Sequence, residues 1–140
     1  MPNLKLPLFL TRLFIALFLA PWWIGKAVNI DLTKGLFAKY YNVDHLPDAL
    51  AYAIGGLGLL LLLAFLLGFK KRISYGLIFG IHAVGTLMAL PYLVPDYFDK
   101  FGIFPNTPFN ILFMAALPTA AAMFLLYILR KQDLFLTIDR

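Results

Sequence analysis

Two ionisable side chains inside long apolar stretches are the groups from which any chemistry of this chain would start. His82 lies near the middle of one stretch, and Arg12 lies about two helical turns into another. An ionisable group is costly to remove from water, so such a residue is by default a candidate for function. With a helical period of 3.6 residues, His82 shares a face with Tyr75 and Thr86. An imidazole, a phenol and a hydroxyl together can hydrogen-bond a quinone.

Three interpretations of His82 stay open on the sequence alone. The first is a quinone contact made with Tyr75 and Thr86. The second is structural, with a neutral imidazole bonded to a carbonyl or hydroxyl of a neighbouring helix. The third is haem or metal ligation, but a membrane haem of the b type usually needs two His, and His45 lies in a loop. We therefore predict no metal site and consider quinone the one candidate cofactor.

Arg12 and Lys26 are candidates for contact with a lipid headgroup or a partner protein. Arg12 is preceded by Lys5 and lies on the same helical face. No acid lies within any apolar stretch to pair with it, so we expect it to snorkel to the headgroups or to cap backbone carbonyls. An anionic headgroup or a partner's carboxylate is the alternative. Lys26 lies three residues past the aromatic pair Trp22-Trp23, where a headgroup or partner contact is also expected.

Several kinds of catalytic machinery are excluded by what the sequence lacks. There is no cysteine, which excludes disulfides, thiolate catalysis and Cys-ligated clusters. No Ser-His-Asp order, phosphate-binding loop or zinc-type spacing is present. We assign no catalytic residue, and the sequence favours a protein that is not itself an enzyme.

The apolar stretches predict the elements that hold these residues. Hydrophobic residues make up 62% of the 140 residues and charged residues 14%, against about 45–50% and about 25% in soluble domains. Four stretches are each close to the roughly 20 residues that a helix needs to cross a bilayer. They cover residues 6–24, 49–69, 73–94 and 109–129. The prediction is an all-α polytopic membrane protein, a four-helix transmembrane bundle formed by the single domain 1–140.

The distribution of charge predicts how this bundle is oriented. The net charge is +5, and the basic residues flank the apolar stretches, so they reflect topology rather than nucleic-acid binding. Lys70, Lys71 and Arg72 form a short basic turn, and basic residues also dominate near both termini. The positive-inside rule places the turn and both termini in the cytoplasm. In the first external loop, about 25–48, apolar residues at helical spacing predict a short interfacial helix.

Small residues at spacings of three and four predict where the helices touch. Helices in lipid associate through close packing of small residues, because lipid tails are as apolar as leucine. Three of the stretches contain such a pattern: Ala51, Gly55 and Gly58; Gly76, Gly80 and Ala83; Ala115, Thr119 and Ala122. We expect these faces to be helix contacts rather than binding loops.

Several segments resemble the DoxX-like family of small bacterial membrane proteins. These are the Arg-led helix ending in Gly25-Lys26, the run Ile54-Gly-Gly-Leu-Gly58 followed by leucines, the basic turn Lys70-Lys-Arg72, and the charged tail Leu129–Asp139. The resemblance implies a four-helix bundle in the bacterial inner membrane, in a family linked to quinone-reducing sulfur oxidation and to oxidoreductase assemblies. The family often has a Glu before the helix-two glycines, where this chain has Tyr52-Ala53-Ile54. That departure puts a redox role in doubt, and no catalytic residue carries over.

Three hypotheses of function follow. The leading one is an accessory or scaffold subunit of a larger bacterial membrane complex, respiratory or photosynthetic, whose partners are the lipid bilayer and other membrane subunits. The alternative is a quinone-linked membrane oxidoreductase subunit of the DoxX type. A weaker alternative is a small transporter or lipid-handling protein.

Overall fold

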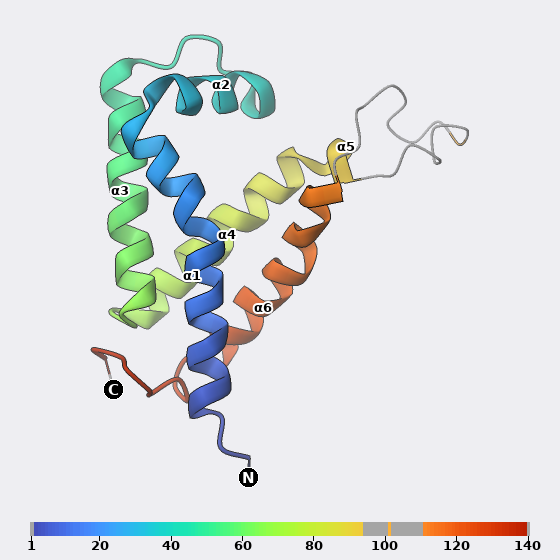
Figure 1. The fold of residues 1–140 in the computed structure, drawn as a ribbon. Helices are drawn as coiled ribbons and strands as arrows, with labels where there is room; N and C mark the ends of the chain where they lie inside the picture. Colours follow the sequence, from blue (N-terminus) through green and yellow to red (C-terminus); the bar gives the residue numbers. More distant parts are fainter. Residues whose placement is uncertain (1, 94–100, 102–110, 140) are drawn as a thin grey trace.

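The computed structural model describes residues 2–93, 101 and 111–139. All regular secondary structure in these residues is helical, which confirms the all-α prediction. The elements are α1 (Lys5–Val28), α2 (Ile30–Tyr41), α3 (Asp48–Leu66), α4 (Lys71–Met88), the single turn α5 (Leu90–Leu93), the 3-10 helix η2 (Ile111–Ala115) and α6 (Ala116–Ile128) (Figure 1).

The long helices pack as two pairs that join into one bundle. α1 lies along α3, α4 lies along α6, and contacts of α3 with α4 and of α1 with α6 connect the pairs. Figure 1 shows α4 and α6 inclined to the first pair, with α2 across one end. Buried side chains of all four helices form the core, among them Ile15 and Leu19, Leu62 and Phe65, Ile78, and Met123 and Leu126.

Asn29 makes the corner between α1 and α2. Its extended backbone ends α1, and its side-chain oxygen caps α2 by accepting from the N–H groups of Asp31 and Leu32 at 3.1 and 3.3 Å. Such a cap satisfies amide groups that have no partner inside the helix. The buried Thr33 donates from its hydroxyl to the carbonyl of Lys26, at 3.0 Å. These bonds turn α2 away from the axis of α1.

An ion pair connects α2 to the first residue of α3. The Lys34 ammonium donates to the Asp48 carboxylate. This hydrogen bond raises the pKa of Lys34 above its ordinary value. Both groups keep contact with solvent, so the pair contributes little to stability.

The turn between α3 and α4 depends on left-handed backbone. Gly68 has a φ of 61° and Lys70 a φ of 47°, a region that glycine adopts without strain. The N–H of Phe69 donates back to the carbonyl of Ala64 at 2.9 Å and closes the end of α3. A Cβ on Gly68 would lie 2.5 Å from the Thr137 side chain, so the site also requires glycine sterically.

The third and fourth predicted stretches are less regular than the first two. α4 ends at Met88 and Ala89 separates it from α5, two residues before Pro91, where a missing N–H and the proline ring disfavour continued α-helix. α6 is preceded by the 3-10 turns of η2, and Pro118 falls in its first turn, where proline is tolerated. The last residue of the range 73–94 and the first two of the range 109–129 lie outside the described residues.

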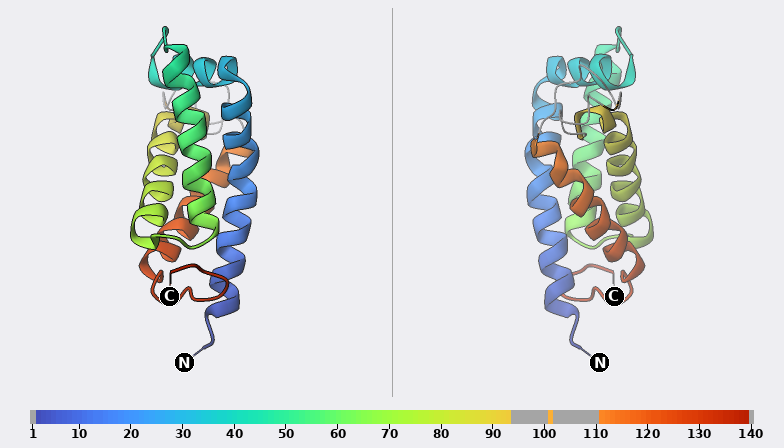
Figure 2. Two further views of the ribbon diagram at one scale, coloured as in Figure 1. Left: turned by 90° about the vertical axis from the view of Figure 1, so that its left-hand side faces the viewer. Right: turned by 90° about the vertical axis from the view of Figure 1, so that its right-hand side faces the viewer.

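Within the described part of the chain, α1 and α3 are long and apolar enough to cross a membrane, judged by length and composition. The apolar helix Phe113–Ile128 is shorter. Both termini and the basic α3–α4 turn lie at the same end of the molecule, opposite α2, in Figures 1 and 2.

Candidate functional site

Four charged or polar side chains from three segments meet at the basic end of the bundle; we call Arg12, Lys71, Tyr75 and Asp133 the Arg12 cluster. The guanidinium of Arg12 donates to the Asp133 carboxylate at 2.6 Å and to the Tyr75 hydroxyl at 3.2 Å. The Tyr75 hydroxyl donates to the same carboxylate oxygen at 2.6 Å. Arg12 and Asp133 are completely buried. One carboxylate thus holds together α1, α4 and the segment after α6.

The C-terminal tail, residues 130–139, completes the cluster with backbone groups. The second guanidinium nitrogen of Arg12 donates to the carbonyls of Phe135 and Leu136, at 2.8 and 3.0 Å. The Lys71 ammonium donates to the carbonyl of Asp133 at 2.6 Å. The tail also pairs with the α3–α4 turn, through the N–H of Ile138 and the carbonyl of Leu67 at 2.9 Å. Figures 1 and 2 show the tail lying across this end of the bundle.

The charges in the cluster compensate one another in part. Arg12 and Lys71 supply two cations and Asp133 supplies one carboxylate, while three backbone carbonyls accept further hydrogen bonds from Arg12 and Lys71. A buried charge pair repays its loss of hydration only when further hydrogen bonds satisfy its other atoms. Arg12 Nε and Asp133 Oδ1 are the buried side-chain atoms without a hydrogen-bond partner in the described residues. These contacts are typical of a structural junction between segments rather than of a site that transfers a proton to a substrate.

The expected snorkelling of Arg12 is wrong for this structure. The side chain is 0% exposed and bonds to the chain's own carboxylate and carbonyls. The alternative of carbonyl capping describes part of what is found. Asp133 was missed because it lies outside every apolar stretch. The available signal was the tail itself, where an acid is followed by the apolar Leu134-Phe135-Leu136, a pattern suited to folding back onto a bundle.

His82 binds the neighbouring helix. Its Nε2 lies 2.9 Å from the carbonyl oxygen of Ala116, the first residue of α6. The Thr86 hydroxyl donates to the backbone carbonyl of His82 at 2.8 Å. Tyr75 lies about 10 Å away along α4, at seven residues of about 1.5 Å each, and its hydroxyl belongs to the Arg12 cluster. The three residues predicted as a quinone contact are therefore not brought together, and the contact of His82 is the one that its structural interpretation describes.

Lys26 lies at the other end of α1 from the Arg12 cluster. Its ammonium lies 4.1 Å from the ring centroid of Trp23, within the range of a cation–π interaction. The side chain is half-buried. The contact orients the lysine along its own helix and leaves the predicted headgroup or partner contact as a prediction.

The small residues of α3 lie directly against α1. Ala51, Gly55 and Gly58 are buried. A Cβ on Gly55 would come within 2.6 Å of the backbone oxygen of Lys26, and one on Gly58 within 2.0 Å of the Trp23 ring. The two helices approach so closely only because these positions have no side chain.

The small residues of the other two patterns, on α4 and at α6, make fewer close contacts with neighbouring helices. A Cβ on Gly76 would meet the Tyr127 ring of α6 at 3.3 Å, whereas nothing lies within 4 Å at Gly80. Ala83, Thr119 and Ala122 are half-buried, and Ala115 is exposed. The closest helix approach is therefore between α1 and α3.

Among the described residues, no group of three or more His, Asp or Glu side chains gathers where a metal ion could be held. Comparison with known proteins adds no relative, since no family model, curated protein or solved structure matches the sequence. The DoxX-like resemblance stays a prediction. The chemistry of the site must therefore be judged from its geometry, which is that of a closed structural junction.

Proposed function

We propose that the chain is a multi-pass membrane protein that serves as an accessory or scaffold subunit of a larger membrane complex and has no catalytic site of its own. One observation carries the proposal: the ionisable groups buried in the described bundle bind the chain itself, while the outer faces of the helices are apolar. Such a protein offers lipid-facing and partner-facing surface rather than reactive groups.

The outer surface supports a membrane location. Phe14, Leu57 and Leu87 are each exposed by more than 60%, and large apolar side chains face outward on every long helix. Soluble monomers rarely expose a contiguous apolar patch above a few hundred Å². α1 and α3 have the length to cross a bilayer. We propose that α4 with α5, and η2 with α6, cross it as well, because α4 contacts α3 and α6 contacts α1.

The orientation follows from the charged end. The exposed cations Lys70, Arg72 and Lys131 lie at the end that carries both termini. Positive charge is retained on the cytoplasmic side, so we propose that this end faces the cytoplasm of a bacterial inner membrane. α2 then lies on the outer interface, with Phe37 stacked on Tyr41 at 4.9 Å between ring centroids.

Single cysteines test the topology, since the chain has none of its own. In bacterial cells, we expect Asp44→Cys to react with a membrane-impermeant maleimide added outside, and Lys131→Cys to react only in inverted vesicles. Extraction of the protein by alkaline carbonate, or labelling of Lys131→Cys in intact cells, would contradict the proposed insertion and orientation.

Purification from native membranes in a mild detergent tests the scaffold role. We expect the chain to elute with other membrane subunits in fixed ratio. A monodisperse monomer without a partner, under conditions that preserve other membrane complexes, would overturn the proposal. The quinone-linked alternative makes the opposite prediction for His82→Leu, which should then lose extractable quinone or turnover.

A further inference from the structure

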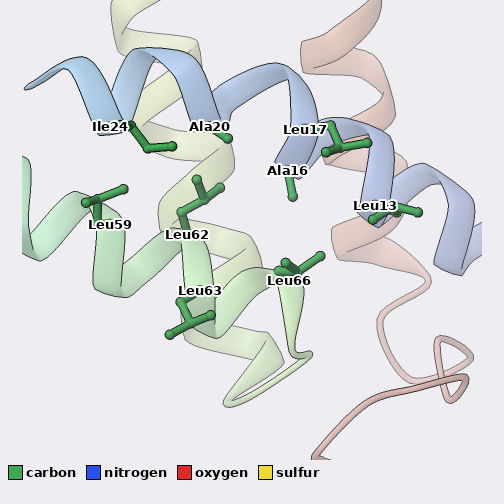
Figure 3. A pocket seen from close by; sticks show the side chains of 9 residues that line it. All are labelled: Leu13, Ala16, Leu17, Ala20, Ile24, Leu59, Leu62, Leu63 and Leu66. Atoms are coloured by element: carbon green, nitrogen blue, oxygen red, sulfur yellow. The ribbon is translucent and has the colours of Figure 1, made fainter.

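Two neighbouring apolar hollows lie beside α3. The first, between α1 and α3, has a volume of about 210 Å³ and is lined by Ala16 and Ala20 on one side and by Leu59, Leu62 and Leu63 on the other (Figure 3). The second is bordered by Leu63, Phe69 and Ile138. Leu63 lines both hollows, so they are neighbours, and we call the two together the groove. The second hollow, beside Phe69 of the α3–α4 turn, is its basic end.

The shape of the groove favours a flexible chain over a second helix. Ala16 and Ala20 open a furrow on α1, but the facing wall consists of leucines, and Leu63 projects with half of its surface exposed. Helix contacts in lipid are enriched in small residues, which the α3 wall of the first hollow lacks. The groove lining is aliphatic throughout its first part, so the matching ligand is a hydrocarbon chain.

The charges at the basic end of the groove indicate which headgroup the bound hydrocarbon chain would have. The Lys70 ammonium lies 5.9 Å from the ring centroid of Phe69, which borders the second hollow. Lys70 and its neighbour Arg72 are exposed, whereas Lys71 is occupied by the Asp133 carbonyl. The half-buried Asp139 is the acid nearby, its N–H bonded to the carbonyl of Gly68 at 3.2 Å. Lys70 therefore places an exposed cation at the groove mouth.

We propose that this groove binds one acyl chain of an anionic phospholipid from the cytoplasmic leaflet, with the headgroup phosphate at Lys70. The inference rests on the proposed membrane insertion and orientation. Basic side chains at a membrane surface attract anionic lipid with about 1 kcal/mol each. Burial of methylene groups in the aliphatic groove adds to this attraction. The site therefore selects a lipid both by its acyl chain and by the negative charge of its headgroup.

Native mass spectrometry of the intact detergent-solubilised protein tests the site. Phosphatidylglycerol and phosphatidylcholine with identical acyl chains are added together. We expect about fivefold preferential retention of phosphatidylglycerol. Lys70→Gln should remove this preference, whereas the matched variant Lys131→Gln, at the same end but after α6, should keep it.

Filling the groove tests the acyl chain separately. Leu63→Trp is placed on an exposed position, so the fold should tolerate it, and Ala20→Leu fills the same furrow from α1. Each should lower retention of both lipids by about tenfold, the effect of displacing about two methylenes from burial. Circular dichroism confirms that each variant is folded.

Equal retention of the two lipids, or retention unchanged by both filling variants, overturns the site. Crosslinking of Leu63→Cys to another polypeptide in native membranes assigns the groove to a partner helix and likewise overturns it. If carbonate extracts the protein, the proposed membrane insertion has failed first; if the protein stays inserted without lipid preference, only the lipid site has failed.

Discussion

Arg12 illustrates, at the scale of single residues, how a charge can be kept inside an apolar bundle. Moving a guanidinium out of water costs several kcal/mol, and mutual attraction repays this only with good geometry and further hydrogen bonds. Here the carboxylate of Asp133, the Tyr75 hydroxyl and two carbonyls surround it. The Arg12–Asp133 pair holds α1 and the C-terminal tail together. Removing either partner would leave the other charge buried and unpaired.

Removing Asp133 should therefore be far more damaging than removing a surface acid. We expect Asp133→Ala to lower the free energy of unfolding by about 3–5 kcal/mol, because Arg12 is left buried without its carboxylate. Asp44→Ala, on an exposed loop, serves as control and should change it by less than about 0.5 kcal/mol. Denaturant titration in detergent, followed by circular dichroism, measures both. Similar effects of the two variants would show that Arg12 is not buried as described.

His82 should behave as a helix-to-helix hydrogen bond. We expect His82→Leu to cost about 1 kcal/mol of unfolding free energy, the net value of one such bond, because the carbonyl of Ala116 loses its side-chain partner. The same titration measures this change. A loss as large as that of Asp133→Ala would point to a role of His82 beyond the bond to α6.

The contact between α1 and α3 is, at the scale of elements, the one that leaves least room for change. Gly55 faces the backbone of α1 at Lys26 and Ala27, whereas its neighbour Gly56 has nothing within 4 Å of an added Cβ. Side chains can adjust, but two helix backbones can relieve a clash only by moving apart. The two neighbouring glycines therefore have opposite structural requirements.

Alanine substitutions at these two positions should differ in sign. We expect Gly55→Ala to cost about 1–3 kcal/mol through overpacking. Gly56→Ala should be neutral or stabilise by up to about 1 kcal/mol, because alanine favours helix over glycine. Thermal unfolding of both variants in the same detergent provides the comparison. Equal destabilisation would mean that α3 does not present Gly55 to α1.

The C-terminal tail closes the bundle at the scale of the whole molecule. It brings Asp133 to Arg12, pairs Ile138 with Leu67, and places Thr137 over Gly68. The tail therefore links the start of α1, the α3–α4 turn and the end of α6. Terminal residues without such contacts usually tolerate deletion. Here the C-terminal tail supplies the carboxylate that pairs with the buried Arg12.

A chain that stops after Gln132 should be strongly destabilised for this reason. We expect a loss of about 3–5 kcal/mol, as for an unpaired buried charge. Arg12→Leu in the shortened chain should restore part of the loss, because it removes the charge that the tail compensates. Thermal stability and detergent-resistant yield measure both. If Arg12→Leu worsens the shortened chain, the tail acts mainly through its apolar contacts.

The sequence by itself determined the helical class and the approximate extent of the helices, because a long apolar stretch favours a helix through residues that are adjacent in the chain. It also predicted a helix within residues 25–48 and the small residues at Gly55 and Gly58. The tertiary structure decided the partner of Arg12, since the pair spans 121 residues of sequence and no local pattern encodes such a meeting. It also separated Tyr75 from His82, because one face of a helix can touch different neighbours two turns apart. Helix propensity follows from residues that are adjacent in the sequence, whereas the partners of a buried charge depend on which distant segments the fold brings together.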